Sequence, residues 1–359
     1  MPADPAAAAS AGAGAWADDA SATFLVADPE RELAGVRLQH DMRIRDEQAE
    51  FSRDGNGWQL VLGRLPLLRL EYLLELRYPG GGSKVVTDPA NPRQVGGAFG
   101  PKSVLEFPGY APPSWLDAPG GRGTESSFEV EGPGDTLTAR VWSPAGARAD
   151  EPLPMLVAHD GPEYDALSRL TGYLGAGVAA GWLPPLRAAL LSPGPRSDWY
   201  SADPRYARAL CRSVLPALAA RYPISARIGM GASLGALALL HAHARYPGSF
   251  DALFLQSGSF FTPETDSNDR PFPHFRRIAG FVGRVLGGGA LESAGLPVPV
   301  SLTCGAIEWN AANNAVMTAA LAAHGYPAVL HELTDTHNYT AWRDAFDPHL
   351  TRLLAQVAA

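Results

Sequence analysis

The chain has 359 residues, a length that suggests two domains, and its hydrophobic fraction of 46% can support a sizeable core. Its formal net charge of −8 offers no basic surface for nucleic acid and works weakly against binding to an anionic membrane, so we expect neither partner. Cys211 and Cys304 are too few for a disulfide framework and lie in no metal or redox motif, so we expect two small buried residues and no metal or cofactor.

Residues 1–21 are rich in alanine with scattered acidic residues, and we expect them to form a disordered, low-complexity arm. This segment lacks the basic start and the apolar centre of a secretory signal. No run of 18 apolar residues occurs elsewhere, so we expect no membrane span. The default interpretation is a cytoplasmic protein.

Residues 22–115 show the pattern of a small all-β domain. Short extended segments alternate with turns, and Asp54-Gly55-Asn56-Gly57 is a strong hairpin signal before an alternating strand. This pattern predicts an antiparallel, immunoglobulin-like sandwich. Prolines and glycines then mark an exit, and we expect a linker at residues 116–125. The predicted strands are 23–26, 32–38, 49–53, 58–62 and 70–76.

Residues 126–359 alternate strands with helices, which predicts a layered α/β domain with a mostly parallel sheet. An antiparallel pair at 127–130 and 137–142 leads the domain. The insert at about 262–296 is rich in glycine and charge, and we hypothesise that it caps a pocket. Further strands are predicted at 155–158, 188–191, 226–230, 250–255, 298–304 and 329–333, and helices at 166–179, 204–220, 236–243, 311–323 and 339–357.

The most informative motif of this domain is Gly231-Ala232-Ser233-Leu234-Gly235, a G-x-S-x-G sequence. An apolar strand precedes it and a helix pattern follows, which is the setting of the nucleophile elbow of α/β hydrolases. The glycines permit a sharp turn that exposes the serine hydroxyl. We therefore interpret Ser233 as a catalytic nucleophile, the alternative being a plain glycine-rich strand–helix turn.

A nucleophilic serine needs a base and an orienting acid. In α/β hydrolases these follow the serine in the order acid, then base. His337 lies in the loop after the last predicted strand and is the expected base, the alternative being a surface histidine near a helix start. Glu308 follows a predicted strand and is the expected acid, with Asp335 as its rival. The non-catalytic alternative for Glu308 is an acidic residue that stabilises a helix N-terminus.

The oxyanion of an acyl-transfer intermediate is held by backbone amides. One is expected from Leu234, the residue after the nucleophile, and one from the loop that follows an earlier strand. That loop contains Gly161, Pro162 and Glu163. Since Pro162 has no N–H, the second donor is Gly161 or Glu163, and we favour Gly161.

Together these segments resemble the enterochelin esterase family, within the esterase D group of α/β hydrolases. The resemblance rests on His159-Asp160-Gly161, on the G-x-S-x-G motif, on Glu308 and on His337-Asn338-Tyr339-Thr340-Ala341-Trp342-Arg343. It implies hydrolysis of ester bonds, in known members those of trilactone catecholate siderophores, with Ser233, Glu308 and His337 as triad. The chain departs from the pattern at Asp335, Thr336 and Asn338, and at Trp199, where a glutamate is usual.

Two residues are expected to contact the small-molecule ester, which in this family is a ferric siderophore. Arg196 can hold an anionic or catecholate group by charge-assisted hydrogen bonds, and Trp309 can line an aromatic pocket; an ordinary surface arginine and a packed core tryptophan are the alternatives. Serine esterase is the leading hypothesis for function. An acyltransferase of the esterase D group and a non-catalytic binding protein on a hydrolase scaffold are the alternatives.

Overall fold

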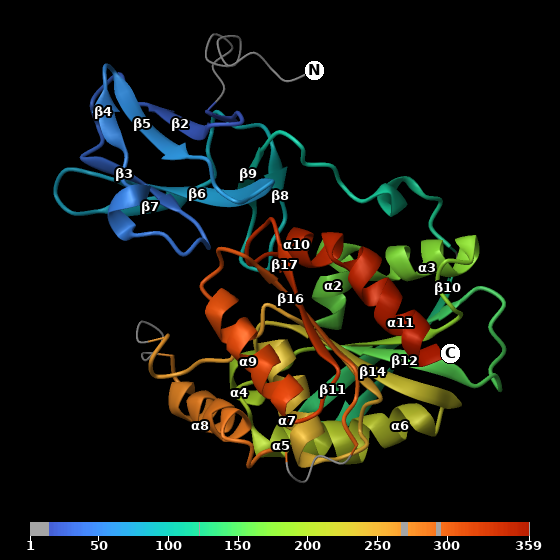
Figure 1. The fold of residues 1–359 in the computed structure, drawn as a ribbon. Helices are drawn as coiled ribbons and strands as arrows, with labels where there is room; N and C mark the ends of the chain where they lie inside the picture. The colour runs from blue at the N-terminus through green and yellow to red at the C-terminus, as the bar shows by residue number, and fades with distance from the viewer. Residues whose placement is uncertain (1–13, 122, 267–271, 292–295, 359) are drawn as a thin grey trace. The chain divides into compact units, whose positions relative to one another are not determined.

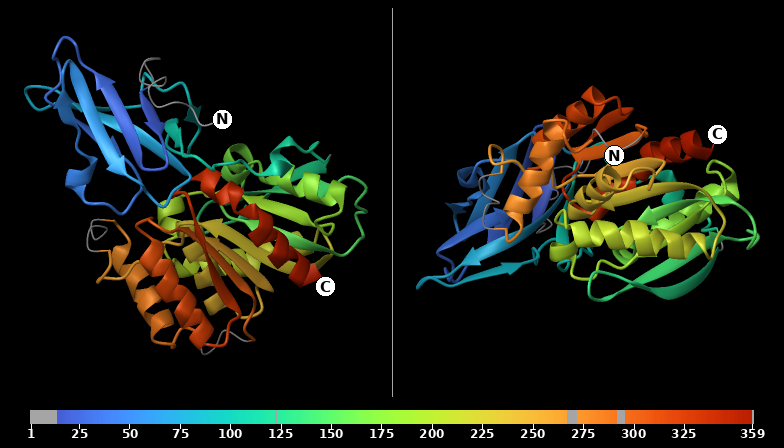
Figure 2. Two further views of the ribbon diagram at one scale, coloured as in Figure 1. Left: turned by 45° about the horizontal axis from the view of Figure 1, so that its top comes forward. Right: turned by 90° about the horizontal axis from the view of Figure 1, so that it is seen from below.

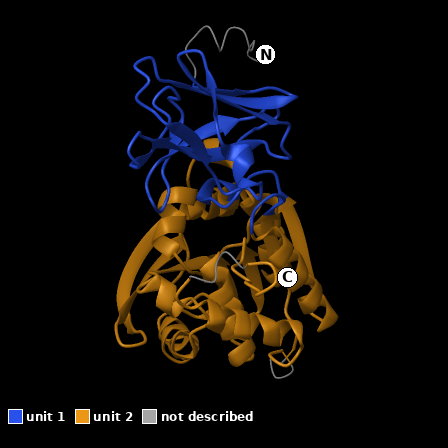
Figure 3. Ribbon diagram, turned by 90° about the vertical axis from the view of Figure 1, so that its left-hand side faces the viewer, with its two compact units in different colours: residues 1–112, 305–309, 333–341 blue, residues 113–304, 310–332, 342–359 orange. Residues whose placement is uncertain are grey.

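The computed structural model describes residues 14–121, 123–266, 272–291 and 296–358, and these fall into two compact units (Figure 3). Two segments of the expected catalytic domain, Gly305–Trp309 and Leu333–Ala341, belong to unit 1 together with the chain up to Pro112. Unit 2 consists of Pro113–Cys304, Asn310–Glu332 and Trp342–Ala359.

Unit 1 is built on two antiparallel sheets that share one apolar core (Figure 1). Phe24 of the first sheet packs edge-on against Tyr72 of the second, with ring centroids 5.1 Å apart. The expected small all-β domain is therefore confirmed, including the hairpin in which Asp54 pairs with Gly57. The first sheet has the order β1 (Ala15–Ala17), β2 (Ser21–Ala27), β5 (Gly57–Gly63), β4 (Ser52–Asp54), and the second β3 (Gly35–Gln39), β6 (Arg69–Arg77), β9 (Lys102–Glu106), β8 (Gln94–Val95), with β7 (Ser83–Val86) on β6 and the 3-10 helix η1 (Asp46–Ala49) after β3.

The disordered arm expected for residues 1–21 lies largely outside the described residues, and its described part is not an arm. Ala15–Ala17 form β1, which pairs with β2, so that Trp16 lies opposite Thr23. The alanine-rich composition of this segment does not predict an edge strand, because alanine does not favour the strand conformation.

Unit 2 contains an eight-stranded sheet, and the expected α/β domain is confirmed. Its leading strands β10 and β11 form the predicted antiparallel pair, and β11 joins β13 in antiparallel fashion. The central strands from β13 to β16 are parallel. The order is β10 (Gly123–Glu131), β11 (Thr136–Pro144), β13 (Arg187–Leu191), β12 (Leu153–Ala158), β14 (Ile224–Ala232), β15 (Ala252–Gln256), β16 (Val300–Gly305), β17 (Ala328–Leu333).

Helices cover both faces of this sheet (Figures 1 and 2). On one face the Tyr173 hydroxyl of α3 lies 2.7 Å from Thr351 Oγ1 of α11. On the other, α7 packs against β14 and β15 and is buried along nearly its whole length. The helices are η2 (Ser114–Asp117), α2 (Gly161–Ser168), α3 (Leu170–Ala180), α4 (Arg196–Trp199), α5 (Pro204–Ala209), η3 (Leu210–Val214), α6 (Leu215–Ala219), α7 (Leu234–Arg245), α8 (Phe275–Leu286), α9 (Ala311–Ala323), α10 (Tyr339–Asp344), η5 (Phe346–Leu350) and α11 (Thr351–Ala358).

Two helices predicted as continuous are interrupted in the structure. The helix expected at 166–179 is two helices, because Arg169 between them has a left-handed backbone with φ 53°. The helix expected at 339–357 is broken at Asp347, whose extended φ/ψ of −105° and 123° precedes Pro348. A residue before proline avoids the helical region, which explains this break. In the insert at 262–296, sequence analysis missed helix α8.

Candidate active site

The G-x-S-x-G segment forms a sharp turn between β14 and α7. Ser233 stands between these elements with φ 55° and ψ −121°, a strained conformation for a residue with a side chain. A Cβ on Gly231 would approach the carbonyl carbon of Gly235 to 2.7 Å, so the turn closes only with glycine at this position. This strand–turn–helix geometry is that of a nucleophile elbow.

A second serine contacts the elbow. The hydroxyl of Ser259 lies 3.0 Å from the hydroxyl of Ser233, and its backbone N–H donates to the Ser233 carbonyl at 3.1 Å. Ser259 follows β15 and is buried. Sequence analysis missed it, because the contact arises from the parallel pairing of β14 with β15 and no motif marks it.

Both expected oxyanion donors begin helices. Leu234 is the first residue of α7 and Gly161 the first residue of α2. The first N–H groups of a helix have no partner within the helix and lie at the positive end of its dipole, which suits an anion. A Cβ on Gly161 would lie 2.3 Å from Leu190 Cα in β13, so only glycine fits here. Glu163, the alternative donor, lies two residues further into α2.

An ion pair fixes the loop that carries Gly161. Arg196 donates from Nε and Nη2 to the two carboxylate oxygens of Asp160, at 2.8 and 2.9 Å, and Asp160 is buried. Nη2 also donates to the Ala232 carbonyl at 3.4 Å. Arg196 thus connects the residue before Gly161 with the residue before Ser233. Its guanidinium is already paired with a carboxylate, and the substrate contact expected for it stays a prediction.

His159, the residue before Asp160, is a neutral structural histidine. Its Nδ1 lies 3.1 Å from the Gly235 carbonyl, which can only accept, so Nδ1 carries the proton and Nε2 accepts from the Tyr206 hydroxyl at 2.9 Å. Its ring also stacks on Tyr200. Burial lowers the pKa of His159 to about 4. Both ring nitrogens are engaged, so His159 is unsuited to be the base for Ser233.

The expected acid and base are in contact within unit 1. His337 Nδ1 lies 3.0 Å from Glu308 Oε2, and Glu308 Oε1 accepts the Gly305 N–H at 2.7 Å. The Glu308 side chain is 1% exposed, whereas that of His337 is 28% exposed. A carboxylate that accepts from Nδ1–H leaves Nε2 unprotonated, which is the tautomer that a general base needs.

Asp335, the rival acid, has other partners. Its carboxylate accepts from Asn338 Nδ2 at 2.9 Å and from Arg69 Nη1 at 3.2 Å. Glu308, and not Asp335, is therefore the carboxylate paired with His337 in the described contacts. The Glu308–His337 pair belongs to unit 1, while Ser233, Leu234 and Gly161 belong to unit 2.

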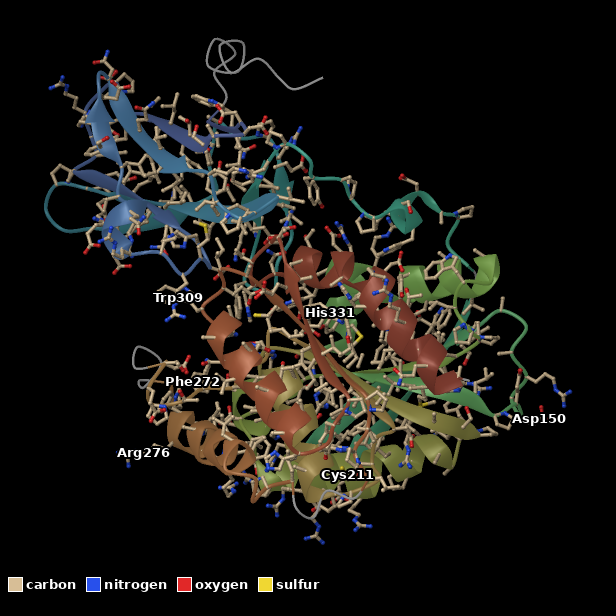
Figure 4. The ribbon with its side chains drawn as sticks, viewed as in Figure 1. Asp150, Cys211, Phe272, Arg276, Trp309 and His331 are labelled. Carbon is tan, nitrogen blue, oxygen red and sulfur yellow. The ribbon has the colours of Figure 1, made fainter. Side chains whose placement is uncertain are left out.

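Trp309, expected in a substrate pocket, is 48% exposed, and its side chain lies at the surface in Figure 4. It is therefore not the packed core residue of the alternative interpretation. A role in binding substrate stays a prediction. Of the two cysteines, Cys304 is buried and Cys211 half-buried, and both are free thiols.

Over the described ranges of the chain, no group of three or more His, Cys, Asp or Glu side chains is arranged to hold a metal ion. None of the helices found in those ranges is both long enough and apolar enough to span a membrane.

Comparisons with solved structures return esterases. The ferric enterobactin esterase of Salmonella typhimurium matches with a TM-score of 0.73 and 20% identity, over 94% of this chain and 95% of that one. The enterobactin esterase of Shigella flexneri, solved in the presence of enterobactin, matches with a TM-score of 0.70 and 18% identity over 94% and 92%. A ferulic acid esterase matches with a TM-score of 0.54 and 15% identity, over 66% of this chain and 99% of that one.

No family model and no curated protein sequence matches the chain. At 15–20% identity the structural likeness establishes a shared fold. The resemblance to enterochelin esterases drawn from the motifs is confirmed at that level, and for the enterobactin esterases it extends over both units of the chain.

Proposed function

We propose that this protein is a serine esterase that hydrolyses carboxylic esters through an acyl-enzyme. The observation that carries the proposal is the backbone of Ser233, a strained serine between a parallel strand and a buried helix. Strain of this kind persists where the surrounding structure enforces it, and it is typical of catalytic turns. The hydrogen-bonded Glu308–His337 pair adds the base and acid that such a serine requires.

In the proposed mechanism His337 Nε2 accepts the Ser233 hydroxyl proton as Oγ attacks the ester carbonyl. The amides of Leu234 and Gly161 stabilise the oxyanion, and His337 then gives the proton to the leaving alcohol. Water repeats the sequence to release the acid. Glu308 holds the Nδ1–H of His337 and stabilises the imidazolium that forms during both steps.

The substrate to test first is a catecholate siderophore trilactone. This choice is supported by the structural likeness to enterobactin esterases over 94% of the chain and by the motif resemblance. An aryl ester of the ferulate type is the second choice, since the ferulic acid esterase shares only the fold of about two thirds of the chain.

The test compares hydrolysis of p-nitrophenyl butyrate by the wild-type protein with that by Ser233→Ala and His337→Gln. We expect each variant to lose about 10⁴-fold or more in kcat, because members of a catalytic triad act as a unit. Ser83→Ala, an exposed serine on β7, is the matched control and should keep full activity.

Equal rates in Ser233→Ala and the wild type would contradict the esterase proposal. A protein that hydrolyses p-nitrophenyl butyrate through Ser233 but leaves apo and ferric trilactones intact would contradict the siderophore assignment alone. The positive outcome is conversion of the trilactone to its linear trimer, which chromatography detects.

A further inference from the structure

The loops that carry Glu308 and His337 are hydrogen-bonded to the β-sandwich of unit 1. Arg43 donates its backbone N–H to the Ile307 carbonyl at 2.6 Å, and Met42 forms an antiparallel β-bridge with Glu308. Ile307 also packs against the apolar core of the sandwich. The acid is therefore fixed from the sandwich by backbone pairing on one side and by apolar packing beside it.

The His337 loop is fixed in a different way, by a buried arginine. Leu68 donates its N–H to the Thr334 carbonyl at 2.7 Å. The next residue, Arg69 of β6, donates from Nη1 to Asp335 Oδ2 at 3.2 Å and to Asn338 Oδ1 at 3.4 Å. The Arg69 side chain is only 4% exposed. Its two partners flank His337 in the sequence, so the arginine contacts the loop on both sides of the base.

This arginine is held by a third group of its own strand. Glu71 Oε1 accepts from Arg69 Nη2 at 2.9 Å, and Glu71 is buried as well. One cation thus faces two buried carboxylates, and burial raises the pKa of Asp335 to about 7 although Arg69 acts in the opposite direction. Removing a charged partner from such a cluster leaves uncompensated buried charge, and the polypeptide must move to solvate it. The freest part of the cluster is the loop at 334–338, because Arg69 and Glu71 lie within a paired strand.

We propose that Arg69 is a positioning residue for His337, and that the β-sandwich clamps the acid and base loops of the active site. The proposal rests on the proposed function for its catalytic meaning. It assigns the N-terminal domain a part in the reaction itself, distinct from that of a separable binding module. Misplacement of a catalytic group by about 1 Å can cost 10²-fold in rate, so a clamp of this kind has a measurable effect.

The experiment compares Arg69→Met and Arg69→Lys with Arg77→Met in the full chain. Arg77 lies on the same strand, is half-exposed and pairs with Glu50 and Glu75, so it is a matched control away from both loops. Hydrogen exchange followed by mass spectrometry reports the order of segments 305–309 and 333–341. Kinetics with p-nitrophenyl butyrate report kcat and KM separately, and thermal unfolding reports the remaining fold.

We expect Arg69→Met to exchange faster in 333–341 and to lose about 10- to 100-fold in kcat with KM changed less than about threefold. Arg69→Lys should show smaller changes in both the exchange rate and kcat, because lysine keeps the positive charge but lacks the planar guanidinium that can contact two partners at once.

Unchanged exchange in 333–341 would overturn the inference, and so would faster exchange with an unchanged kcat. If the wild type shows no Ser233-dependent hydrolysis, the proposed function fails first and the catalytic part of this inference fails with it. An Arg77→Met variant that behaves like Arg69→Met would also overturn it.

Discussion

The hydroxyl of Ser259 lies 3.0 Å from the hydroxyl of Ser233, the proposed nucleophile. A hydroxyl can donate one hydrogen bond and accept others. In the proposed mechanism Ser233 donates to a base, so Ser259 is left to donate to Ser233 Oγ and to hold its rotamer. This assignment adds a positioning residue that lies outside the triad.

Ser259→Ala should therefore lower kcat by about 2- to 10-fold, the equivalent of one neutral hydrogen bond of about 0.5–1.5 kcal/mol, without changing the unfolding temperature. Steady-state kinetics with p-nitrophenyl butyrate measure this effect. The control is Ser301→Ala on β16, a buried serine whose Oγ has no hydrogen-bond partner among the residues the structure describes. A kcat as low as that of Ser233→Ala would show that Ser259 is part of the chemistry and not only a support for it.

Among the elements, one arginine links the loops after β12 and β13 to the residue before Ser233. Arg196 of α4 joins Asp160, which caps α2, to Ala232 at the end of β14. Asp160 has a left-handed backbone, with φ 51°, and this conformation sets the direction of the Gly161 amide. In the proposed mechanism the pair would therefore support the oxyanion loop, a role different from the substrate contact expected from the sequence.

Arg196→Gln distinguishes these two roles. If the arginine supports the oxyanion loop, kcat for the neutral substrate p-nitrophenyl butyrate should fall by about 10²-fold with little change in KM, since loss of one oxyanion donor costs about 2.7–4 kcal/mol. If it binds anionic substrate, KM should rise for an anionic ester alone. Arg205→Gln, at an exposed arginine paired with Asp203, is the control and should affect neither ester.

The order of elements and the elbow were predictable because each rests on a local pattern. The alternation of strands with helices, the hairpin at 54–57 and the helix at Ala311–Ala323 all agree with the structure. The break before Pro348 has a local cause in the proline itself, although the helical pattern of 339–357 runs through it. Helix α8 was missed because it lies inside a segment whose glycine and charge content suggested a loop.

The site was predictable only where chain order carries information. The choice of Glu308 over Asp335 agrees with the contact to His337, because acid and base occupy fixed places after strands in this fold. The Arg69–Asp335 pair joins residues 266 positions apart, and no pattern in one sequence can reveal it. For the same reason, a single boundary at residue 126 assigns Gly305–Trp309 and Leu333–Ala341 to the second domain, whereas the structure groups both segments with unit 1.

At the scale of the whole molecule, unit 2 contains buried and half-buried histidines that the proposed reaction does not use. Burial lowers the pKa of His159, His243 and His349 to about 4 and that of His241 to about 3. In the unfolded chain each titrates near 6.5. A folded-state pKa below the unfolded value means that these neutral rings stabilise the fold above pH 6.5, and that the stabilisation is lost as the pH falls toward 4.

Asp335 in unit 1 acts with the opposite sign. Its folded pKa of about 7 exceeds the usual 3.8, so its contribution to stability is present below pH 3.8 and is lost as the pH rises through 7. Burial also raises the pKa of Glu163, so two carboxyls oppose the histidines as the pH falls from 6.5. Burial lowers the pKa of His40 and His331 as well, so the histidines outnumber these carboxyls and decide the direction.

The free energy of unfolding should therefore fall on acidification from pH 6.5 to 4.5, by about 1.4 kcal/mol per pH unit for each histidine that remains neutral in the folded state. Urea unfolding followed by tryptophan fluorescence at several pH values measures this slope. His241→Phe keeps an aromatic ring against Phe281, which packs edge-on at 4.8 Å, and removes one titrating group. In that variant the free energy of unfolding should change with pH less steeply, by the equivalent of about one bound proton. The reason is that the ionisation is lost while the packing is kept. An unfolding free energy that stays constant or increases between pH 6.5 and 4.5 in the wild type would contradict the burial of these rings in neutral form.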